Sequence, residues 1–140
     1  MMEMLRRAAD PGNRRTILIV EDDEVLRIVW RFEFEKNGFD VREAENGQAG
    51  LASVVGMNPD IIITDLEMPM MDGFSFMTAV RNTDGSRAIP IIAVSAAKNN
   101  GLAGKAVAAG ASQFCEKPIS FNSLLAIVNH HLSTNDPARK

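Results

Sequence analysis

The chain has 140 residues, of which 46% are hydrophobic and 24% charged, and its formal net charge is −3. This composition is ordinary for one globular domain with a single core, and the negative charge provides no basic footprint for direct nucleic-acid binding. No apolar run approaches the roughly 18 residues that cross a bilayer, which argues against a membrane segment. The lone Cys115 cannot form an internal disulfide, so we expect a reducing, cytoplasmic location.

Strands and helices are predicted to alternate along the chain. Two runs of apolar and β-branched residues, 16–20 and 61–64, are too short for helices and contain no charged residue, which is typical of strands buried on both faces. Pro, Gly and Asn residues mark turns between the segments. In chain order we expect strand 16–20, helix 25–37, strand 39–44, helix 48–55, strand 61–64, helix 74–81, strand 89–95, helix 97–109, strand 112–116 and helix 121–132.

Residue types at the helix ends support these limits. Gly38 and Gly110 are predicted to end the first and fourth helices, and Ser120 to cap the last one. Helical spacing then indicates which side chains face the core. The predicted inward residues are Leu26, Val29 and Phe34 in the first helix and Leu51, Ala52 and Val55 in the second.

The alternation predicts an α/β domain. Repeated βαβ units with right-handed crossovers produce a parallel sheet that is covered by helices on both faces. We assign residues 16–132 to this domain, 1–15 to a flexible N-terminal extension and 133–140 to a C-terminal tail. The extension carries charges but lacks the hydrophobic region of a secretory signal.

Chemically active side chains follow the predicted strands. Because the carboxyl ends of parallel strands meet at one edge of a sheet, we expect these side chains to converge. Crowded carboxylates stay ionised most easily around a cation, and hard oxygen ligands suit Mg²⁺. Each residue alone could instead be a helix cap or a solvated side chain, but together they favour a phosphoryl-transfer site. The set comprises Glu21, Asp22, Asp65, Ser95 and Lys117.

Five motifs, in this order and at these intervals, carry a resemblance to a known family. The motifs are ILIVEDD at 17–23, PDIIITD at 59–65, MPMMDG at 68–73, VSA at 94–96 and GASQFCEKP at 110–118. With them, residues 16–132 resemble the receiver domain of two-component response regulators, including those of chemotaxis. The resemblance implies a flavodoxin-like, doubly wound five-stranded parallel sheet of order 2-1-3-4-5 with five helices.

The resemblance also implies a metal-dependent phosphorylation site. Asp65 matches the aspartate that accepts a phosphoryl group from a phosphohistidine. Asp22 and Asp65 match carboxylate ligands of Mg²⁺ or Mn²⁺. Glu67 matches the position that offers its backbone carbonyl to the metal, and Glu21 is similar to an acid that binds the metal through a water molecule.

Three further residues match the parts of the family that respond to the phosphate. Lys117 resembles the lysine that pairs with Asp65 and then with the phosphate, often beside a cis bond to the next proline. Ser95 matches the switch hydroxyl, and Phe114 the switch aromatic that turns inward behind it. Phe114 lacks the hydroxyl of the more usual tyrosine and cannot signal through a hydrogen bond from that ring. We therefore expect it to report phosphorylation through a change in its packing. The weakly specified Ala- and Gly-rich segment between 95 and 114 is the expected switching element.

The first predicted helix has an irregular apolar face, because Glu33 falls within that face and two aromatic residues fall partly outside it. Receivers commonly present this helix to a histidine kinase or a histidine phosphotransfer protein. We therefore expect Ile28, Trp30 and Phe32 to form part of a partner surface. The alternative is a rotated helix in which these side chains belong to the core.

The function implied by the resemblance is a phosphorylation-controlled signalling switch. Only self-catalysed phosphotransfer and slow autodephosphorylation are expected of it as an enzyme. Its downstream protein partner is not evident, and both a monomer and a homodimer are compatible with the sequence. Two alternatives stay open: a metal-dependent phosphohydrolase with an Asp nucleophile, and a scaffold that binds without phosphorylation. We also hypothesise that the Glu67 side chain orders the water that hydrolyses the acyl phosphate.

Overall fold

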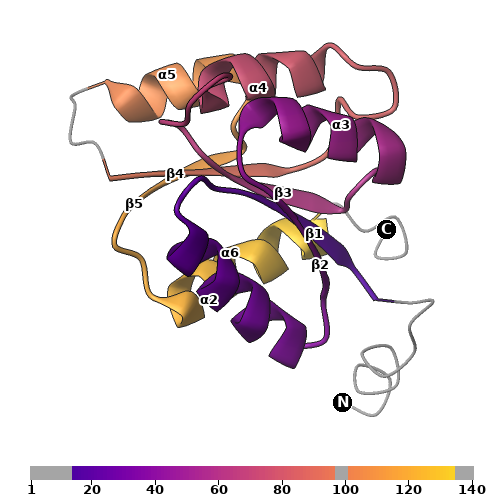
Figure 1. Cartoon of the computed structure of the whole chain (residues 1–140), viewed down its shortest axis with the longest axis vertical. Coiled ribbons are helices and arrows are strands. Elements are labelled where there is room, and N and C mark those ends of the chain that lie inside the picture. The colour runs from indigo at the N-terminus through magenta and orange to yellow at the C-terminus, as the bar shows by residue number, and fades with distance from the viewer. Residues whose placement is uncertain (1–13, 97–100, 135–140) are drawn as a thin grey trace.

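The computed structural model describes residues 14–96 and 101–134, where five strands alternate with five helices (Figure 1). Segments 1–13, 97–100 and 135–140 lie outside the described residues, and with them most of the expected extension, the start of the expected fourth helix and most of the tail. The elements are β1 (Thr16–Val20), α2 (Glu24–Lys36), β2 (Asp40–Ala44), α3 (Gly47–Met57), β3 (Ile61–Asp65), α4 (Gly73–Arg81), β4 (Ile91–Ser95), α5 (Leu102–Ala109), β5 (Gln113–Glu116) and α6 (Phe121–Thr134).

The five strands form one parallel sheet in the order β2-β1-β3-β4-β5, which confirms the predicted flavodoxin-like topology. Every residue of β3 and β4 is buried, and only the first residue of β1 is partly exposed. These strands are buried because helices cover both faces of the sheet, so the unbroken apolar runs predicted them correctly. In the register of the central strands, Asp65 lies opposite Val94.

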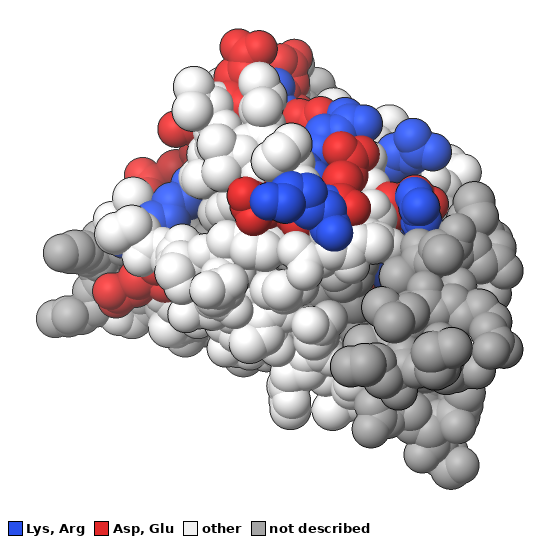
Figure 2. Space-filling view, turned by 90° about the horizontal axis from the view of Figure 1, so that it is seen from below, with Lys and Arg blue, Asp and Glu red and all other residues white. Residues whose placement is uncertain are grey.

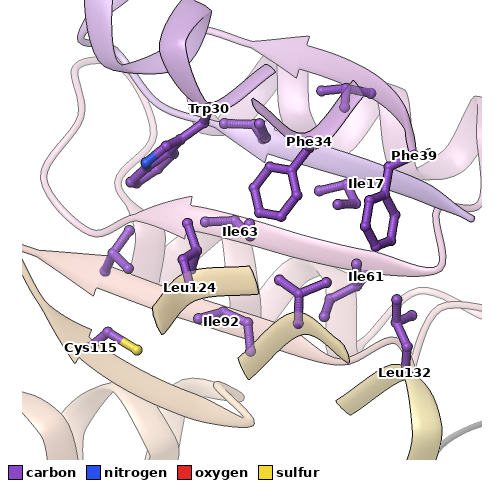
Figure 3. Packing of buried hydrophobic residues seen from close by; sticks show 14 residues of the cluster. Ile17, Trp30, Phe34, Phe39, Ile61, Ile63, Ile92, Cys115, Leu124 and Leu132 are labelled. Atoms are coloured by element: carbon purple, nitrogen blue, oxygen red, sulfur yellow. The ribbon is translucent and has the colours of Figure 1, made fainter. Parts of the chain in front are cut away.

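Helices α2 and α6 cover one face of the sheet, and α3, α4 and α5 cover the other (Figure 1). Figure 3 shows the first of the two resulting cores, where side chains of α2 and α6 meet those of β1, β3 and β4. Phe34 lies at its centre, with its ring edge-to-face against Phe39 and Phe121 at centroid distances of 5.7 and 4.8 Å. Such geometry adds to the stabilisation from apolar burial.

Several element limits differ from the prediction for local reasons. Strand β4 begins at Ile91, after Pro90, which has no N–H for the ladder but accepts a hydrogen bond from Ile62 N–H at 3.0 Å through its carbonyl. Helix α6 extends to Thr134, so the expected tail begins later than residue 133. Ser120 Oγ accepts a hydrogen bond from Ser123 N–H at 3.1 Å, which confirms the predicted cap.

Helix α3 is rotated relative to the prediction. Ala52 is exposed and Val55 is 68% exposed, whereas Gly50 and Val54 are buried against the sheet; Leu51 packs partly against the core, as predicted. A Cβ at position 50 would lie only 3.0 Å from core side chains of β1 and α4. The missing side chain therefore lets α3 approach the sheet along its glycine face. Among the described residues, no helix is long and apolar enough to cross a membrane.

Candidate functional site

The ends of four strands deliver the predicted site residues to one edge of the sheet. Glu21 directly follows β1, and Asp65 and Ser95 are the last residues of β3 and β4. Lys117 directly follows β5, and its backbone N–H donates to the Ser95 carbonyl at 2.9 Å. Because all these strands run in parallel, their carboxyl ends lie along one edge of the sheet. The side chains therefore come together there, as predicted.

Three acids form a cluster at this edge. Glu21, Asp22 and Asp65 each place one carboxylate oxygen within 4.8 Å of the others. Glu21 is fully buried and Asp65 is 6% exposed, while Asp22 is exposed to solvent. Mg²⁺ keeps several waters among its oxygen ligands, so carboxylates at this separation can hold it directly or through a water molecule. A hard divalent cation such as Mg²⁺ or Mn²⁺ therefore fits the donors, with the open side at Asp22 left for water.

Lys117 contacts two of these acids. Its Nζ lies 2.6 Å from Glu21 Oε1 and 3.4 Å from Asp65 Oδ2. The shorter contact is thus with Glu21, whereas the family resemblance implies a pair with Asp65. The peptide bond from Lys117 to Pro118 is cis, as the resemblance implies.

Burial and charge alter the protonation of this pair. Desolvation raises the pKa of Glu21 from 4.5 to about 7, although hydrogen bonds from Lys117 and from the Asp23 backbone act in the opposite direction. Burial alone would lower the pKa of Lys117, but the hydrogen bond to Glu21 and the charge of Asp65 raise it above its ordinary value. The ammonium therefore remains charged at neutral pH. A proton or a metal ion bound to Glu21 can offset the cost of its buried negative charge.

The backbone after β3 holds the Asp65 carboxylate in place. Asp65 Oδ1 accepts a hydrogen bond from Leu66 N–H at 2.7 Å and a longer one from Glu67 N–H at 3.4 Å. Gly73 passes so close that a Cβ there would lie 2.3 Å from the Asp65 carbonyl oxygen. The sequence indicated Gly73 only as a turn residue, but its lack of a side chain is what permits this approach.

Ser95 ends β4, and Phe114 lies within β5. Ser95 is fully buried, and its Oγ donates a hydrogen bond to Glu67 Oε1 at 3.2 Å. Phe114 is half-buried against the core beneath α5 and lies opposite Ala93 in the ladder. The contact between Ser95 and Glu67 was not predicted, because the two residues are 28 positions apart and no local pattern connects them.

Arg27 is a second contributor that sequence reasoning missed. Its Nη1 donates to the backbone carbonyl of Glu21 at 2.7 Å, and its Nε to Glu43 Oε1 at 2.9 Å. The guanidinium thus ties α2 to the end of β1 and helps fix the backbone that presents Glu21 and Asp22. An arginine in the first turns of a helix carries no sequence signal for this role.

Comparison with known proteins agrees with this geometry. Residues 17–129 match the family described as Response regulator receiver domain. This chain belongs to that family. Receiver domains are the regulatory phosphoacceptors of two-component signalling and accept phosphoryl groups from histidine kinases, so phosphorylation-dependent switching is implied for this chain.

Individual receivers show the extent of the similarity. The chemotaxis protein CheY of Bacillus subtilis is 33% identical over 118 residues, which cover 84% of this chain and 97% of CheY. The KDP operon transcriptional regulatory protein KdpE of Escherichia coli is 34% identical over 125 residues, which cover 86% of this chain but 54% of KdpE; the chain thus spans about half of that relative. The receiver domain of the Francisella response regulator 1452 is 26% identical, with a TM-score of 0.81 over 88% of this chain and 100% of that domain.

The outer side of α2 in this receiver carries an apolar stripe, but its residues differ from the prediction. Ile28 and Phe32 are 53% and 60% exposed, together with Val25 and Val29 at 72% and 48%. Trp30 is only 3% exposed, so its assignment to an exposed partner surface was wrong. The inward face of α2 consists of Leu26, Trp30 and Phe34, which pack against the sheet. This contact fixes the rotation of the helix.

A cavity of about 300 Å³ lies between α2 and the loop after β5. It adjoins the acid cluster, because Lys117 lines the cavity and contacts Glu21 and Asp65. Figure 2 shows the side of the receiver that carries α2 and α6, where charged side chains gather toward one part and leave a broad uncharged area beside them. The cavity is lined by Leu26, Trp30, Ala96, Lys117, Pro118 and Ile119.

Proposed function

We propose that this receiver is a signalling switch in which Asp65 accepts a phosphoryl group from a phosphohistidine of a partner protein. The observation that supports this is the acid cluster of Glu21, Asp22 and Asp65, whose oxygens lie within 4.8 Å of one another. The ammonium of Lys117 lies 3.4 Å from Asp65. A nucleophilic carboxylate, a cation site and a fixed positive charge are the parts that phosphoryl transfer requires.

In the transfer step, a carboxylate oxygen of Asp65 attacks phosphorus, an O–P bond forms and the P–N bond to the donor imidazole breaks. The electrons of the broken bond leave with the imidazole, so an acyl phosphate forms without any oxidant or reductant. The Leu66 N–H orients the carboxylate through its 2.7 Å bond to Oδ1. Lys117 balances the negative charge of the phosphoryl oxygens.

The same residues provide the metal site of the proposal. Asp22 and Asp65 contribute carboxylate oxygens, Glu67 contributes its backbone carbonyl, and Glu21 acts through a water molecule. A bound Mg²⁺, or Mn²⁺, would neutralise charge on the phosphoryl group. The exposure of Asp22 supports a metal that keeps water ligands on the solvent side, with the buried Asp65 on its inner side.

We propose Ser95 and Phe114 as the parts that respond to phosphorylation. The Ser95 hydroxyl would leave its present acceptor and donate to a phosphoryl oxygen, and Phe114 would repack against the core beneath α5. Helix α5 suits such a movement, because Ala106 is the only one of its eight residues that is buried. Elements with few buried apolar contacts have low local stability and are the parts of a domain that move most readily.

The exposed stripe Val25, Ile28, Val29 and Phe32 on α2 is the proposed docking surface for a histidine kinase or a histidine phosphotransfer protein. Its spacing of three and four residues is that of a helix face that packs against another helix. The stripe belongs to the same helix as two residues of the cavity beside Lys117. A partner helix on the stripe would therefore bring its phosphohistidine near Asp65.

Location and assembly complete the proposal. Cys115 is a buried free thiol, which suits the reducing cytoplasm. The domain is proposed to span residues 16–132, to bind no nucleic acid directly and to act through a downstream protein. Molar mass in solution, measured with and without phosphorylation, decides between a monomer and a homodimer.

Incubation with Mg²⁺ and acetyl phosphate, followed by intact mass measurement, tests the proposal. We expect one added phosphoryl group in the wild type and none in Asp65→Asn or in the presence of a chelator. Asp84→Asn is the matched control, because its side chain is 97% exposed on a distant loop; it should be phosphorylated like the wild type.

The same experiment separates the alternatives. A wild-type chain that takes up no phosphoryl group with Mg²⁺ present would favour the scaffold. Continuous turnover of a generic phosphate ester, lost in Asp65→Asn, would favour the phosphohydrolase. A single stable addition without turnover supports the switch.

A further inference from the structure

Glu67 reaches from the loop after β3 to the end of β4. Its Oε1 accepts a hydrogen bond from Ser95 Oγ at 3.2 Å. Ser95 is fully buried, whereas Glu67 is exposed, so the carboxylate approaches the hydroxyl from the solvent side. Asp65 pairs with Val94 in the sheet, so Glu67 and Ser95, which follow these two residues, lie at the same edge.

A serine hydroxyl has one proton to donate. In the proposed function, Ser95 donates that proton to an oxygen of the phosphoryl group on Asp65. In the structure, Ser95 Oγ donates a hydrogen bond to Glu67 Oε1 instead. The carboxylate and the phosphoryl group are therefore competing acceptors for the same donor.

We propose that Glu67 is a latch that holds the Ser95 hydroxyl in the unphosphorylated chain and opposes its transfer to the phosphoryl group. The inference rests on the proposed function and adds a positioning residue to it. The latch differs from an effect of Glu67 on the hydrolytic water, because it changes the affinity of the site for a phosphoryl group rather than the rate of hydrolysis. Removing the acceptor should make the switched arrangement easier to reach.

The negative charge of Glu67 provides a competing explanation, because any acid near the phosphoryl group repels it. A latch needs an acceptor atom, whereas repulsion needs only charge. Glu67→Gln separates the two, since it retains a carbonyl acceptor and loses the charge, while Glu67→Ala loses both. A second separation uses Ser95→Ala, which removes the donor and leaves the charge of Glu67 in place.

The test is calorimetric titration of the Mg²⁺-loaded full chain with beryllofluoride, a mimic of the phosphoryl group. The variants are Glu67→Ala, Glu67→Gln, Ser95→Ala and Ser95→Ala combined with Glu67→Ala. We expect Glu67→Ala to bind on the order of five- to tenfold more tightly than the wild type, the factor of one hydrogen bond. Glu67→Gln should resemble the wild type, and Glu67→Ala should have no further effect once Ser95 is alanine. Glu45→Ala, which removes another exposed acid, at the end of β2, should leave affinity unchanged.

Two results would overturn the latch while leaving the proposed function intact. One is equal tightening by Glu67→Gln and Glu67→Ala, which would assign the effect to the charge of Glu67. The other is unchanged affinity in Glu67→Ala, or a gain that persists in the Ser95→Ala background. A wild-type chain that binds no beryllofluoride and accepts no phosphoryl group would overturn the proposed function, and the latch with it.

Discussion

The stability of the metal-free chain should depend on pH through Glu21. Burial raises the pKa of this carboxyl from 4.5 to about 7. Between these pH values the folded chain holds one more proton than the unfolded chain, so the free energy of unfolding falls as pH rises. The stabilisation is fully present below about pH 4.5 and is lost as pH rises through about 7.

Glu21→Gln removes this titration. One proton gives a slope of about 1.4 kcal/mol per pH unit, so the interval from 4.5 to about 7 corresponds to roughly 3 kcal/mol. Glutamine has one oxygen where the wild type uses two, because Glu21 Oε1 binds Lys117 and Oε2 accepts from Asp23 N–H at 3.1 Å. The variant therefore also carries a pH-independent cost of about 1 kcal/mol for the lost acceptor.

Urea denaturation at several pH values from about 5 to about 8, in the presence of a chelator, measures both effects. The difference in unfolding free energy between variant and wild type should change by about 3 kcal/mol across this range. Because only the wild type loses stability as pH rises, the variant should become more stable relative to it. Glu45→Gln, at an exposed position, is the control and should follow the wild type. Parallel curves for Glu21→Gln and the wild type would refute the assignment of the shift to Glu21.

Three further outcomes follow from packing and metal binding. Gly73→Ala places a Cβ 2.3 Å from the Asp65 carbonyl oxygen and should cost at least about 1–3 kcal/mol in urea unfolding, with reduced phosphorylation by intact mass; wild-type behaviour would contradict the close approach. Phe34→Ala should lower the free energy of unfolding by about 3–5 kcal/mol. Phe32→Ala, at a 60% exposed position, should lower it by less than about 1 kcal/mol. Similar losses in the two variants would contradict the observed rotation of α2. Mg²⁺ at about 100 times its Kd should stabilise the wild type by about 2.7 kcal/mol, and Asp22→Ala should lose this gain in a thermal shift assay.

The alternating strands and helices, the parallel sheet and the edge that carries the acids were all readable from the sequence. A strand covered on both faces is apolar at consecutive positions, so 16–20 and 61–64 were recognisable without any neighbour. Alternation with helices then requires parallel strands, and parallel strands end at one edge. Acids placed after those strands, at Glu21 and Asp65, had to converge with Lys117 for this reason alone.

Only the tertiary structure decided the rotation of the helices and the partners of the side chains. Helical spacing shows which residues share a face but not which face meets the sheet, so Trp30 proved buried and Val29 exposed, against the prediction. The bond from Lys117 to Glu21 joins residues 96 positions apart, and the bond from Ser95 to Glu67 joins the ends of two neighbouring strands. Such pairs depend on strand register and backbone approach over long separations, for which neighbouring residues in the chain carry no signal.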